Sequence, residues 1–154
     1  MLGPMVNPAF PPRQLVGVFS LELARLYGYL YQEAKKDFVV LHDVGGYDEI
    51  SLTHAAKVYT NQGEQMLEPE DFLSRRVEEE ELKGGETIEE SAQIFLNILE
   101  GKGTEAQNSV VIANAGLALF AGNQEKGLAH AMDRAKESLS SGKAFETFKK
   151  LLNK

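Results

Sequence analysis

Apolar positions near the N-terminus change their period twice. QLVGVFS, residues 14–20, is apolar and partly β-branched, which predicts a short buried strand. Ser20 can cap a helix from Leu21 to about Lys35, because apolar residues then recur at the helical period of about 3.6 positions. DFVVLHD, residues 37–43, predicts a second strand. The pattern is therefore a β-α-β unit, in which a right-handed crossover leaves the two strands parallel.

A hairpin and then a helix are predicted after this unit. AAKVYTNQGEQMLEP, residues 55–69, predicts two short antiparallel strands that turn at NQG and lie at a sheet edge. The highly charged stretch 69–85 favours a solvated loop or helix end. Thr87 and Glu90 have capping-box spacing and open a helix. The buried face expected for that helix consists of Ile88, Ala92, Phe95, Leu96 and Leu99.

The last third of the chain is predicted to be helical. SVVIANAGLALFAG, residues 109–122, is apolar nearly all round, which suits a helix buried in the core. A final helical region covers residues 124–153 and breaks near Gly142. Its expected inner face consists of Leu128, Met132, Ala135, Leu139, Phe145, Phe148 and Leu152. Strands therefore come first and helices after, within one domain of residues 1–154.

Composition excludes several classes of function. The chain has no cysteine, so a disulfide framework, a zinc-thiolate site and a thiol nucleophile are excluded, and a reducing compartment fits. No apolar run approaches the roughly 18 residues that span a bilayer, and the N-terminus lacks the order of a signal peptide. We therefore expect a cytoplasmic protein without a membrane partner. A net charge of −7, without a basic cluster, argues against nucleic acid as a partner.

Candidate chemistry is concentrated in GGYDEISLTHAAKV, residues 45–58. Asp48 and Glu49 follow a glycine pair and precede a β-type run. Adjacent carboxylates on a turn suit a hard cation such as Mg²⁺, which takes oxygen ligands and keeps waters and substrate phosphates in its shell. Acids after glycine are also common turn chemistry, and from these residues alone a turn is the favoured interpretation.

Other polar residues carry weaker signals. The three histidines lack metal-ligand spacing and are interpreted as structural. They are His42 at a strand end, His54 in the strand after the acids, and His130 on a helix. Ser51 and Thr53 alternate along that same expected strand without a base partner, so a nucleophilic hydroxyl has little support.

Several motifs together resemble one family. LGPMVNPA, QLVGVFS, DEISLT, VVIANAGLALFAG and GLAHAMDRAKESLSSGKAFETFKKL follow one another in the order and spacing of the C-terminal part of anthranilate phosphoribosyltransferase. The resemblance covers essentially the whole chain. It implies a nucleoside-phosphorylase-like α/β fold with a mixed sheet and flanking helices. It also implies transfer of the phosphoribosyl group of phosphoribosyl pyrophosphate to anthranilate, in tryptophan biosynthesis.

The same resemblance assigns site residues. It implies that Asp48 and Glu49 bind Mg²⁺, which lowers the barrier by stabilising the pyrophosphate leaving group. It implies that Gly3 and Pro4 line the anthranilate pocket, and no residue of the chain is expected to act as a catalytic acid or base. Full-length members of the family form a homodimer, mainly through a helical domain that has no counterpart in this chain.

The chain also departs from the family. The glycine-rich GTGGD loop that holds pyrophosphate is absent, as is the lysine, histidine and asparagine segment that follows it. His54, Ala55 and Ala56 replace the usual Gly-Pro-Thr. We therefore expect a C-terminal portion of such an enzyme, beginning inside its domain and inactive alone. Alternatives are a subunit completed by a partner, a non-catalytic domain of this fold, and a pyrimidine nucleoside phosphorylase-like protein, which fits DEISLT less well.

Overall fold

The computed structural model describes residues 5–73 and 75–153, and is built around a four-stranded mixed sheet in the order β1-β2-β3-β4. The strands are β1 (Arg13–Gly17), β2 (Asp37–Asp43), β3 (Ala56–Thr60) and β4 (Gly63–Leu67). β1 pairs parallel with β2, and the other neighbours are antiparallel. The parallel β-α-β pairing and the antiparallel edge hairpin predicted from the sequence are both confirmed.

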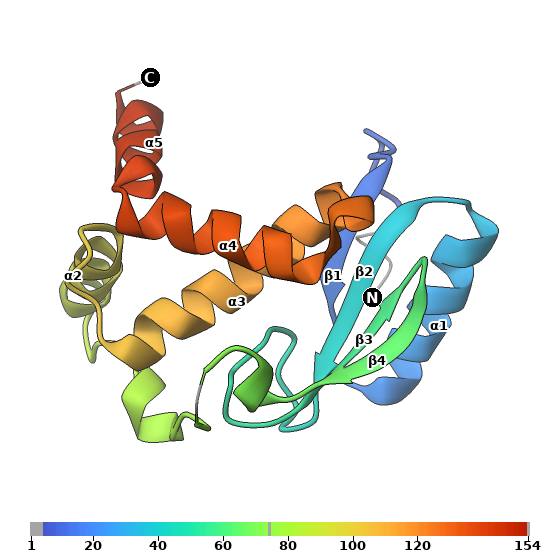
Figure 1. Cartoon of the computed structure of the whole chain (residues 1–154), viewed down its shortest axis with the longest axis horizontal. Coiled ribbons are helices and arrows are strands. Elements are labelled where there is room, and N and C mark those ends of the chain that lie inside the picture. Colours follow the sequence, from blue (N-terminus) through green and yellow to red (C-terminus); the bar gives the residue numbers. More distant parts are fainter. Residues whose placement is uncertain (1–4, 74, 154) are drawn as a thin grey trace.

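Helices cover both faces of this sheet (Figure 1). Helix α1 (Leu21–Glu33) lies on one face, and α3 (Glu105–Gly122) and α4 (Gly127–Ser140) lie on the other. α1 begins where the sequence predicts, because the Ser20 side chain accepts a hydrogen bond from the backbone nitrogen of Leu23. The class is therefore α/β with a mixed sheet and flanking helices, as expected.

Strand β2 contributes to two separate hydrophobic clusters, because successive side chains of a strand point to opposite faces. Val39 and Leu41 pack in a cluster with residues of α3, including Ala113 and Leu117. Phe38 and Val40 pack in a second cluster with residues of α1. Residues 38–43 are all buried, which explains why this segment reads as a continuous apolar run.

The helices α3 and α4 pack closely against each other. Gly116 permits this contact, since a Cβ atom at that position would lie 2.2 Å from the Met132 sulfur. The break expected near Gly142 is also present: this residue has φ of 77° and separates α4 from α5 (Lys143–Leu152). The buried helix predicted at residues 109–122 is confirmed and starts earlier, at Glu105.

The predicted buried face of α2 (Ile88–Leu99) is wrong, although its capping box at Thr87 is present. Ile88 is 84% exposed, and no residue of this helix is buried. Phe95 makes an edge-on contact with Phe148 of α5, with ring centroids 5.0 Å apart. α5 likewise has no buried residue, and Leu152 is 67% exposed. Both helices lie at an end of the molecule remote from the sheet (Figure 1), so apart from this contact their apolar faces are left partly exposed by the residues that the structure describes.

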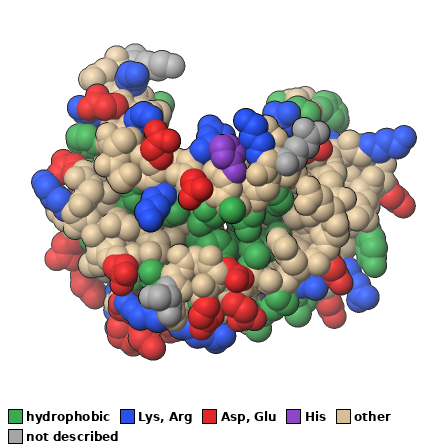
Figure 2. Space-filling view, viewed as in Figure 1, with side chains coloured by type: hydrophobic (Ala, Val, Ile, Leu, Met, Phe, Trp, Pro, Cys, Tyr) green, Lys and Arg blue, Asp and Glu red, His purple; other side chains and the backbone are tan. Residues whose placement is uncertain are grey.

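Side chains gather by type on the face in Figure 2. Hydrophobic side chains occupy its centre, between the sheet and the helical half, and charged side chains lie toward the periphery. Within the described residues, no helix is long and apolar enough to cross a membrane.

Candidate functional site

The two candidate carboxylates lie in the connection between β2 and β3, residues 44–55, here called the acid loop. Asp48 and Glu49 are both exposed and stand immediately before the buried Ile50. The strand expected after the acids is wrong, because β3 starts only at Ala56 and His54 lies in the loop. The alternation of apolar and polar residues here reflects contacts made by a loop rather than a pleated strand.

Asp43, the last residue of β2, organises the acid loop from within. Its side chain is fully buried and accepts three hydrogen bonds. Oδ1 accepts from the backbone nitrogen of Gly45 at 2.8 Å, and Oδ2 accepts from the Ser51 nitrogen at 3.1 Å and the Ser51 hydroxyl at 2.6 Å. Hydrogen bonds to a carboxylate are stronger than those between neutral groups, so Asp43 holds the start of the loop at Gly45 together with Ser51, which follows the acids.

A chain of polar side chains runs from Asp43 to the surface. The Ser51 hydroxyl lies 2.7 Å from the Thr53 hydroxyl, which lies 2.8 Å from Nδ1 of His54. Ser51 donates its proton to Asp43, so its hydroxyl is engaged in holding the loop. This arrangement supports a structural role for Ser51, Thr53 and His54. His42 is also engaged structurally: its Nδ1 lies 2.9 Å from the carbonyl oxygen of Val18.

Three consecutive residues after the acids are each held by a different element. Ile50 is bound on both backbone polar atoms by Asn114 of α3, and Ser51 is bound by Asp43. The carbonyl of Leu52 accepts from the nitrogen of Val77 at 3.0 Å. Leu52 has φ of 63°, a left-handed conformation that costs a leucine about 1 kcal/mol or more and persists only where surrounding contacts impose it.

The acid loop also lies directly against β1. A Cβ atom added to Gly17, the last residue of β1, would lie 1.5 Å from the carbonyl oxygen of Asp48. Only glycine can occupy a position so close to another backbone. The side chains of Asp48 and Glu49 are thus exposed, whereas the backbone that carries them is packed against β1.

The carboxylates of Asp48 and Glu49 make no ion pair or hydrogen bond with any residue that the structure describes. In the described ranges no group of three or more histidine, cysteine or acidic residues could hold a metal ion. The described part of the chain therefore offers two adjacent carboxylates rather than an enclosed cage. This donor set fits Mg²⁺, which binds through one or two carboxylates and takes its remaining ligands from water and phosphate.

A hollow of about 430 Å³ lies beside the acid loop, and Glu49 is part of its wall. Its apolar lining comes from α2 and α3 and includes Ile94, Ile98 and Val111. Tyr47 of the acid loop donates a hydrogen bond of 3.4 Å to Glu79 on another wall of this hollow. The Glu79 carboxylate raises the pKa of the Tyr47 phenol, which keeps the phenol protonated as a donor.

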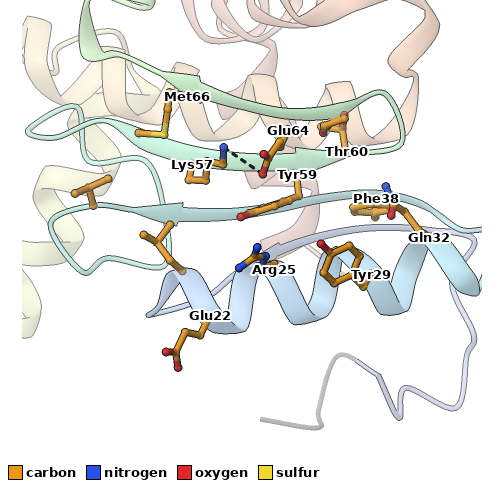
Figure 3. Close-up of a pocket in the computed structure, with 14 residues that line it drawn as sticks. Glu22, Arg25, Tyr29, Gln32, Phe38, Lys57, Tyr59, Thr60, Glu64 and Met66 are labelled. Carbon is orange, nitrogen blue, oxygen red and sulfur yellow. Dashed lines mark hydrogen bonds and ion pairs between the residues drawn. The ribbon is translucent and has the colours of Figure 1, made fainter.

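A groove of about 590 Å³ lies elsewhere, between α1 and the β3-β4 hairpin (Figure 3). Arg25 and Tyr29 of α1 extend toward Tyr59 of the sheet. Lys57 forms an ion pair of 3.2 Å with Glu64, and its ammonium group lies 5.6 Å from the centre of the Tyr59 ring. The lysine charge in this groove is therefore compensated by Glu64.

The ion pair between Arg75 and Glu81 supports the segment that carries Val77. Both guanidinium Nη atoms donate to the carboxylate, at 2.8 and 2.7 Å, and this contact lowers the pKa of Glu81 from its usual 4.5 to about 2. A lowered pKa means that the contribution to stability is fully present above about pH 4.5 and is lost as the pH falls through about 2.

We predict that Arg75→Gln returns the pKa of Glu81 toward 4.5, because the main cause of the shift is removed. A pH titration of the Glu81 carboxyl carbon by NMR measures this. The neighbouring Arg76→Gln is the matched control, since Arg76 pairs with Glu68 and Glu70 and should leave Glu81 unchanged. A Glu81 that titrates near 4.5 in the unmodified chain would contradict the pairing.

The sequence matches the model of a family described as glycosyl transferase family, a/b domain, over residues 1–145. The chain belongs to this family. Anthranilate phosphoribosyltransferase of Flavobacterium psychrophilum is 58% identical over 151 residues, which are 98% of this chain and 46% of that protein. The family resemblance found in the sequence is therefore confirmed. The chain spans about half the length of the curated relatives it matches.

This chain has the same fold as the matching part of solved anthranilate phosphoribosyltransferase structures. The Thermus thermophilus enzyme has a TM-score of 0.85 at 29% identity, covering 97% of this chain and 45% of that one. The Saccharomyces cerevisiae enzyme, solved with PRPP and Mg, has a TM-score of 0.80 at 22% identity, covering 96% and 43%. At that identity the yeast structure supports the fold alone.

The structure describes some of the predicted site residues and adds others. Asp48 and Glu49 lie together on the acid loop, whereas Gly3 and Pro4 lie outside the described residues. Sequence reasoning missed Asp43 and Asn114, which hold the loop. A signal existed for both, since Asp43 directly follows the apolar run of β2 and His42, and Asn114 interrupts the apolar run 110–122 of α3.

Proposed function

We propose that the chain supplies the carboxylate half of a Mg²⁺-dependent site that transfers a phosphoribosyl group from phosphoribosyl pyrophosphate to anthranilate. One observation carries this proposal: two adjacent carboxylates without partners among the described residues stand on a loop held by three elements. The match to anthranilate phosphoribosyltransferases over 98% of the chain supports the choice of substrates.

The proposed roles follow from the chemistry of the reaction. Bound Mg²⁺ neutralises part of the negative charge that develops on the pyrophosphate leaving group. Asp48 and Glu49 hold it on the protein side, and Asp43 and Asn114 keep their backbone in place. The amine of anthranilate then needs mainly correct orientation toward the ribose carbon, which is the role proposed for the segment containing Gly3 and Pro4.

The remaining parts of the site are proposed to come from the half of the enzyme that this chain does not match. The chain would be the C-terminal portion of the α/β catalytic domain, and the GTGGD loop would face the acid loop from the other portion. The cytoplasm is the proposed compartment, in agreement with the absence of cysteine. A homodimer would form mainly through the helical domain of full-length members.

We test the proposal by complementation. The chain is co-expressed with the part of the Flavobacterium psychrophilum enzyme that it does not match, and consumption of anthranilate is followed by fluorescence. We expect no turnover from the chain alone and Mg²⁺-dependent turnover from the complex. Replacing both acids, as Asp48→Asn with Glu49→Gln, should lower turnover about 100-fold or more, because electrostatic stabilisation of the leaving group is lost.

A charge-matched control changes two exposed acids on α1, as Glu22→Gln with Glu33→Gln, and should leave turnover within about twofold. An associated but inactive wild-type complex would contradict the transferase proposal. If the Asp48 and Glu49 variant keeps full Mg²⁺-dependent substrate binding, the acids only shape a turn. That result would favour a non-catalytic domain of the same fold.

A further inference from the structure

Asn114 of α3 binds one residue of the acid loop with both its oxygen and its nitrogen. Oδ1 accepts from the backbone nitrogen of Ile50 at 3.0 Å, and Nδ2 donates to the carbonyl oxygen of Ile50 at 2.8 Å. The second Nδ2 proton goes to the carbonyl oxygen of Val110, one turn earlier in the same helix, at 3.0 Å. These partners fix the orientation of the amide, and Ile50 is bound as it would be by a neighbouring strand.

The residue that Asn114 binds is the anchored residue next to the acid pair. Ile50 follows Glu49 directly, and its side chain is buried in the cluster formed with α3. Neither carboxylate makes a hydrogen bond or ion pair with the described residues, so both acids are placed through their backbone, which Asn114 holds at Ile50 on the C-terminal side of the pair.

Asn114 is itself held in place, because the helix that carries it, α3, is packed firmly against the sheet. Ala113 and Leu117 flank Asn114 on α3 and are fully buried against the sheet cluster. A shift of Asn114 would therefore require α3 to move against a packed core, which is energetically costly. An apolar residue at position 114 would instead leave the Ile50 amide and carbonyl without their partners, and buried backbone groups are rarely left unpaired.

We infer that Asn114 is a positioning residue for the acid pair, holding Glu49 and Asp48 at a fixed place relative to α3 through the backbone of Ile50. This inference rests on the proposed function insofar as the fixed place serves a metal ion. It concerns a residue that does not touch the ion. Its effect is expected on the affinity of the acid pair for a divalent cation and on the mobility of the loop, with the fold retained.

The test uses the full chain labelled with ¹⁵N, with Mn²⁺ alone as the probe. Mn²⁺ takes the same oxygen ligands as Mg²⁺ and broadens the NMR signals of amides near it. In the wild type we expect broadening centred on Asp48 and Glu49, and slow hydrogen exchange at the Ile50 amide. In Asn114→Ala we expect that amide to exchange about tenfold to a hundredfold faster, since two hydrogen bonds are lost. The Mn²⁺ concentration at half-broadening should rise about tenfold.

Two further variants separate positioning from a general loss of structure. Asn114→Asp keeps an acceptor for the Ile50 nitrogen but loses the donor to its carbonyl, so an intermediate effect is expected. Asn108→Ala is the matched control on the same helix, because Asn108 also donates to a backbone carbonyl, that of Gly103, at 3.1 Å. It should leave both the Ile50 exchange and the Mn²⁺ response unchanged.

Each outcome decides the inference. Unchanged Ile50 exchange or an unchanged Mn²⁺ midpoint in Asn114→Ala, with wild-type binding present, would overturn the positioning role and leave the proposed function standing. If the wild type shows no Mn²⁺ broadening at the acid pair, the proposed metal role fails. The exchange of Ile50 then decides alone: faster exchange in Asn114→Ala supports placement of the loop by Asn114, and retained protection overturns it.

Discussion

Gly17→Ala is expected to force the acid loop away from β1 and to lower the free energy of unfolding by about 3 kcal/mol, the upper part of the usual range for overpacking. The added Cβ would lie 1.5 Å from the carbonyl oxygen of Asp48 and 2.5 Å from its carbonyl carbon. These are backbone atoms, so no side-chain rotation relieves the overlap. Urea unfolding, followed by circular dichroism, measures the change.

Gly122→Ala is a suitable control for this variant, since no atom lies within 4 Å of a Cβ at that position. It lies at the end of α3 and should be neutral or slightly stabilising, because alanine loses less backbone entropy on folding. If Gly17→Ala were as stable as the wild type, the acid loop could not lie against β1 as described.

Asp43→Ala should lower the free energy of unfolding by a similar amount, about 3 kcal/mol, because three donors lose their charged acceptor. The donors are the backbone nitrogens of Gly45 and Ser51 and the Ser51 hydroxyl. Faster hydrogen exchange should be confined at first to the acid loop, and in the complemented complex the variant should need more Mg²⁺ for half-maximal turnover.

Asp37→Ala is the matched control for Asp43, at the opposite end of β2. Its carboxylate is largely exposed and lies 3.6 Å from Arg13, so its loss should change stability by less than about 0.5 kcal/mol. Equal effects of the two substitutions would show that the buried carboxylate does not hold the loop.

Local signals in the sequence predicted most of the elements. The cap at Ser20, the capping box at Thr87 and the break at Gly142 depend on neighbouring residues alone, and all three are present. The predicted buried face of α2 was wrong because it, too, was inferred from local sequence alone. Periodicity indicates which side of a helix is apolar, but not whether another element covers that side.

The acid loop shows the second limit of sequence reasoning. Ile50 and Leu52 are buried and alternate with polar residues, as they would in a strand, yet Leu52 has a left-handed conformation that no strand contains. The hydrogen bonds of Asn114 join residues 64 positions apart, and a polar side chain within the apolar run of α3 does not reveal its partner. Family resemblance, rather than the residues alone, made the acid pair a candidate metal site.

The strand β2 has a consequence for how the chain loses its structure. Its alternate side chains belong to both hydrophobic clusters, and its last residue, Asp43, closes the acid loop. Neither cluster can come apart without removing one side of this strand from its packing. The two hydrophobic clusters are therefore thermodynamically coupled through β2, so unfolding of either cluster also removes the support of the acid loop, whereas the loop can open locally while both clusters stay packed.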